Sequence, residues 1–199
     1  MTKGNPKKEI RKAIRERLAS GETKADIFKY LQTQFNNDDF SARLLTISPY
    51  PAQCQRCRKL NYALIAILVV IAIAKVLFAG LFILSEIPKA IPLLLIVPLI
   101  NIYLIYLVAK FNISGYMLIV LFGWLALTDI VVGLCDTMAG LTDAPLPPNI
   151  ITVYIIITAV MFLLVLAAIV LAVVLPRRLL PNTTFFLRPK KNEAGEYIF

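Results

Sequence analysis

Two charged side chains interrupt the apolar stretches of this sequence, and their chemistry needs an explanation first. Lys75 lies within VVIAIAKVLFAGLF, residues 69–82, and Asp129 lies within the apolar stretch 113–135. An ionised side chain in the hydrocarbon core of a membrane costs about 3 kcal/mol or more. Opposite charges at one depth relieve that cost, so we predict that Lys75 and Asp129 form an intramembrane pair inside a helix bundle.

The spacing of the two residues supports a common depth. Lys75 follows residue 61, the start of its predicted helix, by 14 residues, and Asp129 follows residue 114 by 15. At about 1.5 Å per residue, the depths are about 21 and 22 Å. Two alternatives stay open, because Lys75 can extend its ammonium group to the outer interface and burial can keep Asp129 protonated. A structural pair that specifies the helix arrangement is favoured over a transport or proton-relay role.

Asn101 is a third polar residue in an apolar stretch, 90–109. Its side-chain amide can donate and accept hydrogen bonds across helices at moderate depth. We therefore include Asn101 with the charged pair as a candidate intramembrane site.

Cys54 and Cys57 form C-x-x-C in AQCQRCRKL, residues 52–60. Thiols at this spacing can bind metal or exchange disulfides, and cysteines beside a membrane can carry a lipid. A zinc site takes four ligands, whereas the chain has no His and its third cysteine, Cys135, is predicted near the opposite membrane face. We expect inert or lipid-linked cysteines and no cofactor, with metal binding and redox exchange as open alternatives.

Motifs that carry catalysis are missing from the sequence. It contains no nucleophile elbow, phosphate-binding loop, metal-binding His pair or dinucleotide fingerprint. Asp129 has no second carboxylate in the apolar stretches with which to share acid–base work. We expect that the protein is not an enzyme.

The elements that must position these residues are predicted membrane-spanning helices. Apolar residues make up 59% of the 199 residues, and several apolar runs reach the roughly 20 residues needed to cross a hydrocarbon core. We predict an all-α integral membrane protein whose four-helix transmembrane bundle occupies residues 60–175. The four spans are expected at about 61–84, 90–109, 113–135 and 151–175.

The distribution of the net charge of +9 predicts the orientation of these spans. Residues 1–59 carry thirteen Lys or Arg and six Asp or Glu, a net +7, and residues 176–199 carry a net +3. Lys110 adds +1 to the same side of a four-span protein, whereas the two remaining connections sum to zero and −2. By the positive-inside rule, both termini are cytoplasmic in an inner (plasma) membrane.

This basicity is explained by the membrane rather than by a nucleic acid, which we do not expect as a partner. Basic residues beside the spans attract the anionic lipid headgroups of the cytoplasmic side. The predicted membrane-interface anchors are Arg56, Arg58, Lys59, Arg177 and Arg178.

The segment 1–59 is predicted as a cytoplasmic arm of three short helices. Gly21 provides a stop for the first helix, Thr23 with Asp26 can form a capping box for the second, and Asp38 can cap the third. The stretch IRERLASGETKADIFKYL, residues 14–31, resembles helical hairpins of many families, including the haem-lyase subunit of cytochrome c maturation. There the Cys pair precedes the hairpin and here it follows, so the resemblance implies a helical hairpin alone. Residues 176–199 are predicted as a basic cytoplasmic tail, in which a short hairpin is possible.

Taken together, these features lead to two functional hypotheses. The first is a non-enzymatic multi-pass inner-membrane protein that acts through protein–protein interaction, as an accessory subunit, an assembly factor or an immunity-type protein. The alternative is a small channel or transporter subunit in which Lys75, Asn101 and Asp129 line an internal site in an oligomer. The two differ in whether these three residues face one water-accessible cavity. The expected partner is a membrane or cytoplasmic protein, or further copies of this chain in a homo-oligomer.

Overall fold

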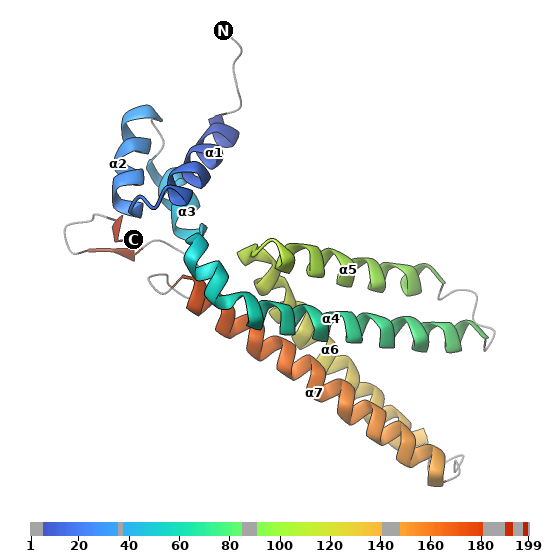
Figure 1. The fold of residues 1–199 in the computed structure, drawn as a ribbon. Coiled ribbons are helices and arrows are strands. Elements are labelled where there is room, and N and C mark those ends of the chain that lie inside the picture. Colours follow the sequence, from blue (N-terminus) through green and yellow to red (C-terminus); the bar gives the residue numbers. More distant parts are fainter. Residues whose placement is uncertain are drawn as a thin grey trace. The chain divides into compact units, whose positions relative to one another are not determined.

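The structure is a computed structural model, which describes residues 6–35, 38–84, 91–140, 148–180, 190–192 and 197–198 (Figure 1). The regular elements among these residues are seven helices and one pair of two-residue strands. The chain divides into two compact units, which are described separately. The arm unit combines Met1–Arg58 with Pro176–Phe199, and the membrane unit is Lys59–Leu175.

Three short helices form the core of the arm unit: α1 (Pro6–Ala19), α2 (Lys24–Gln34) and α3 (Asp38–Ile47). Each helix is amphipathic and turns its apolar face inward, as helical periodicity requires. The buried side chains that pack together are Ile10, Ile14, Leu18, Ile27, Phe28, Leu31, Ala42 and Leu45. The three helices predicted in this segment are confirmed.

Local signals fix the connection between α1 and α2. Gly21 adopts a φ of 86°, and the Gly21 and Glu22 N–H groups donate to the carbonyls of Leu18 and Arg17 at 3.3 and 3.2 Å. These two bonds form a Schellman motif, whose left-handed position glycine occupies without strain. The Thr23 hydroxyl then accepts a hydrogen bond from the Asp26 N–H at 3.3 Å, which caps α2. The predicted stop and cap are both confirmed.

The tail contributes a strand pair and an aromatic contact to the arm unit. Strand β1 (Lys190–Lys191) pairs antiparallel with β2 (Tyr197–Ile198), and the residues between them lie outside the described part of the chain. The Tyr197 ring packs edge-on against Phe28, with ring centroids 5.4 Å apart. Its hydroxyl hydrogen-bonds to the Asp39 carboxylate. Tyr197 therefore joins the tail to both α2 and α3.

The membrane unit contains most of α4 (Pro51–Leu84), all of α5 (Ile91–Ala109) and α6 (Ile113–Gly140), and most of α7 (Pro148–Leu179). Helices α4, α6 and α7 are long and apolar enough to cross a membrane. The side chains of α5 are described from Leu99 onward, where Leu99–Ala109 forms a shorter apolar helix. Three membrane-crossing helices are thus supported, and the fourth span remains a prediction.

Several helix ends differ from the predicted span ends. Helix α4 begins ten residues before the predicted span, at Pro51, so the C-x-x-C motif lies on a helix. Helix α6 continues past residue 135 to Gly140, and α7 passes through Pro176 to Leu179. Pro176 removes one backbone donor, but its carbonyl still accepts a hydrogen bond from the Leu180 N–H at 2.9 Å. Spans were predicted from hydrocarbon thickness, whereas helices end where their hydrogen bonding ends. The predicted connection around residues 85–90 and most of the loop before Pro148 lie outside the described residues.

Candidate functional site

A cavity of about 550 Å³ lies among the four helices of the membrane unit. Helix α4 contributes Lys75 to its wall, α5 contributes Asn101, and α6 contributes Asp129. The structure therefore brings all three predicted intramembrane polar residues to one cavity. Most of the remaining wall is apolar, with Phe122, Leu125, Ile157 and Met161 among its residues.

Lys75 and Asp129 share this cavity without forming a direct ion pair within the described part of the chain. Their charges are nevertheless close enough to interact. Lys75 is half-buried, and Asp129 is exposed where it lines the cavity. The predicted direct pair stays a prediction, and the observed arrangement is two opposite charges on different walls of one cavity.

A buried hydrogen-bond junction sets the height of these charges along their helices. The Tyr116 hydroxyl donates to Asn61 Oδ1 at 2.6 Å, and Asn61 Nδ2 donates to the Val108 carbonyl at 3.0 Å. This junction joins α4, ten residues after its start, to the start of α6 and the end of α5. Lys75 lies 14 residues beyond Asn61, and Asp129 lies 13 residues beyond Tyr116. At about 1.5 Å per residue, both are about 20 Å from the junction.

The helices separate beyond the junction, which explains why equal height does not produce a contact. In Figure 1, α4 and α6 diverge away from their starting ends. Gly115 near the start of α6 lies so close to α5 that an added Cβ would meet Leu107 Cβ at 2.7 Å. In contrast, a Cβ on Gly133, which lines the cavity, would meet nothing within 4 Å. Close packing at one end and divergence at the other leave space for the cavity.

Asn101 is the most buried of the three predicted polar residues, with 7% of its surface exposed. Its Nδ2 atom has no hydrogen-bond partner among the residues that the structure describes. An unpaired buried donor costs about 1–3 kcal/mol. Asn101 is therefore a wall residue with a buried, unpaired amide donor, in a cavity that also holds a positive and a negative charge.

Sequence reasoning missed two hydroxyl groups in the cavity wall. Tyr154 and Thr158 both line it from α7, and the Tyr154 hydroxyl lies 3.2 Å from the Thr137 hydroxyl. Their spacing of four residues places them on one helix face. That pair of polar residues in an otherwise apolar stretch was a usable signal. Asn61 and Tyr116 were also missed, because only tertiary packing reveals that they meet.

The C-x-x-C motif does not belong to the cavity. Cys57 is buried and Cys54 is half-buried on α4, while Cys135 on α6 is exposed. No cluster of three or more Cys, Asp or Glu side chains that could hold a metal ion occurs among the described residues. Inert or lipid-linked cysteines therefore remain the prediction, with metal binding and redox exchange as the alternatives. The basic residues predicted as interface anchors, Arg56, Arg58, Lys59, Arg177 and Arg178, are all exposed.

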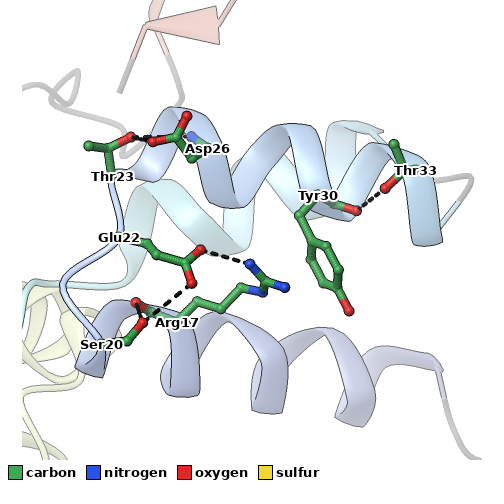
Figure 2. A network of polar contacts seen from close by, with 7 residues as sticks. All are labelled: Arg17, Ser20, Glu22, Thr23, Asp26, Tyr30 and Thr33. Atoms are coloured by element: carbon green, nitrogen blue, oxygen red, sulfur yellow. Dashed lines mark hydrogen bonds and ion pairs between the residues drawn. The ribbon is translucent and has the colours of Figure 1, made fainter.

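The arm unit has a polar network of its own, shown in Figure 2. The Arg17 guanidinium group forms a 2.8 Å ion pair with Glu22 and lies 3.5 Å from the centre of the Tyr30 ring. The hydrogen bond to Glu22 raises the pKa of Arg17 above its ordinary value. The network joins α1, through Arg17, to the connection and to α2, through Glu22 and Tyr30.

Lys24, at the start of α2, is a buried cation in the same unit, with 8% of its surface exposed. Its Nζ atom donates to the Thr46 carbonyl at 3.4 Å and lies 5.4 Å from the centre of the Tyr50 ring. Burial lowers the pKa of Lys24 to about 8. The arm thus carries an ammonium group in a position that disfavours its charge.

No protein-family model, no curated protein and no solved structure significantly resembles this chain.

Proposed function

We propose that this chain is a multi-pass inner-membrane protein that admits a small polar solute to the cavity of its membrane unit, as a small channel or transporter subunit. The observation that carries this proposal is that Lys75, Asn101 and Asp129 line one cavity. Ionisable residues are rare within membrane spans, and those that occur there commonly mark substrate or ion pathways. The cavity also holds a buried donor without a described partner, Asn101 Nδ2.

The proposed orientation places both termini in the cytoplasm and counts α5 as the fourth span. The net charge of +7 in residues 1–59 and of +3 in residues 176–199 supports this orientation through the positive-inside rule. Lys110, between α5 and α6, adds positive charge to the same side, and it hydrogen-bonds to Tyr106 as an interfacial lysine–tyrosine pair would.

Water access to the cavity is the property that tests this proposal, and it needs no knowledge of the solute. In a background with Cys54, Cys57 and Cys135 replaced by Ser, Thr158→Cys places a thiol in the cavity wall. Leu163→Cys on the same helix is the matched control, because Leu163 is 62% exposed and is not part of the wall. A charged, membrane-impermeant thiol reagent is added to native membranes, and labelling is read by mass spectrometry.

We expect Thr158→Cys to react and Leu163→Cys to remain unlabelled until the membrane is dissolved. The charged reagent requires an aqueous path, which lipid around Leu163 denies. If the thiol at position 158 is as unreactive as the control, the cavity is closed to water and the proposal fails.

A second function, binding to another protein, is supported by a separate observation. The arm and the tail form a compact unit with its own core, distinct from the membrane unit. A folded module of this kind suits an accessory subunit or assembly factor that contacts a partner without catalysis. Native mass spectrometry of gently purified protein distinguishes the cases, since a stable complex with a different protein is expected only for this second function.

A further inference from the structure

We infer that the cavity of the membrane unit is a binding site for a small zwitterion, a molecule that carries an ammonium group, a carboxylate and an apolar side group. This inference rests on the proposed function, because it names the class of solute that enters the cavity. It follows from the placement of Lys75, Asn101 and Asp129 around one cavity, on three different helices.

The two charges specify both ends of the guest. In an apolar surrounding each ionised group needs a counter-charge, yet no ion pair joins Lys75 to Asp129 among the described residues. A guest with a single charge would satisfy one residue and leave the other without a partner. A guest with both charges offers its carboxylate to Lys75 and its ammonium group to Asp129, and it adds no net charge to the membrane interior.

The uncharged groups of the wall fit the same guest. Asn101 belongs to the wall, and its Nδ2 atom is buried without a described partner. When the amide turns toward the cavity, it can donate to a carboxylate oxygen of the guest. The Thr158 hydroxyl can donate or accept. Phe122 and Met161 belong to the apolar part of the wall, and an apolar side group of the guest would displace water from it.

The test uses full-length protein in detergent and measures the thermal unfolding midpoint with added ligand, since a ligand that binds only the folded state raises this midpoint. The zwitterions are leucine, methionine and phenylalanine. Each is compared with its methyl ester, which keeps only the ammonium group, and with its N-acetyl derivative, which keeps only the carboxylate.

We expect at least one zwitterion to stabilise the protein, and its two single-charge derivatives to bind at least about thirtyfold more weakly. This factor corresponds to leaving one of the two cavity charges without a counter-charge on the guest. Stabilisation by an ester or an N-acetyl derivative equal to that by its parent overturns the inference, as does the failure of all three zwitterions. If Thr158→Cys is labelled but no zwitterion binds, this inference fails while the proposed function stands.

Two kinds of variant locate the binding. Gly133→Leu places a side chain in the open space of the cavity and should abolish stabilisation by the zwitterion, whereas Val132→Leu, on an exposed position outside the wall, should not. Lys75→Met should shift the preference toward the methyl ester, and Asp129→Asn toward the N-acetyl derivative. A purely structural role of the two charges predicts no change of preference. Unchanged binding by folded Gly133→Leu would place the ligand elsewhere and overturn the inference.

Discussion

Replacement of Lys24 by Met should stabilise the arm at neutral pH, because it removes a charge from a buried position. The residue Lys24 is 8% exposed, and its ammonium group has the Thr46 carbonyl at 3.4 Å as a hydrogen-bond acceptor. Burial lowers its pKa from an ordinary 10.5 to about 8. Since one pH unit corresponds to about 1.4 kcal/mol, the buried charge destabilises the folded arm by about 3 kcal/mol at pH 7.

The sign of the pH dependence follows from proton binding. Below pH 8 the lysine is protonated in both the folded and the unfolded arm, so its burial cost is constant. Between pH 8 and 10.5 the unfolded arm binds more protons than the folded arm, so the stability of the wild type rises with pH. The advantage of Lys24→Met should therefore shrink by about 2 kcal/mol between pH 7 and pH 10.

The assay is pulse proteolysis of the full-length protein across a urea series at several pH values, which reads the free energy of unfolding of the arm. The contributions of the other titrating groups to the free energy of unfolding are the same in the wild type and in Lys24→Met, so they cancel in the difference. Lys29→Met, at an exposed position on the same helix, is the matched control and should show no pH-dependent difference. A Lys24→Met difference that is constant from pH 7 to 10 would refute the reasoning.

Further substitutions test three other contacts: the Asn61–Tyr116 hydrogen bond, the close approach of Gly123 to α7, and the cap of α2. Tyr116→Phe removes the 2.6 Å hydrogen bond to Asn61 and should lower stability by about 1 kcal/mol, and a double-mutant cycle with Asn61→Leu should show coupling of that size. Gly123→Ala should destabilise by about 1–3 kcal/mol, since its Cβ would lie 2.6 Å from a side chain of α7, whereas Gly133→Ala should leave the thermal midpoint unchanged. Thr23→Ala removes the cap of α2 and should cost about 1 kcal/mol in the pulse-proteolysis assay. Absence of coupling would contradict the Tyr116–Asn61 hydrogen bond, and equal effects of the two glycine substitutions would contradict the close packing at Gly123. An unchanged stability of the Thr23→Ala arm would contradict the cap.

The sequence alone determined the elements whose causes are local. The three arm helices, the stop at Gly21 and the cap at Thr23 follow from helical periodicity and backbone preferences within a few residues. The apolar runs likewise predicted helices long enough to cross a membrane, because length and hydropathy depend on no other part of the chain. The rise per residue even placed Lys75 and Asp129 at similar heights.

Only the tertiary structure decided how these elements meet. The junction of Asn61 with Tyr116 joins residues 55 positions apart, and no local pattern specifies which helix faces which. Height along a helix is a product of residue number and rise, but lateral separation depends on how neighbouring helices pack and diverge. The packing at Gly115 and the open space at Gly133 set that separation. As a result, Lys75 and Asp129 lie on different walls of one cavity, because the helices that carry them are close at one end and apart where the charges lie.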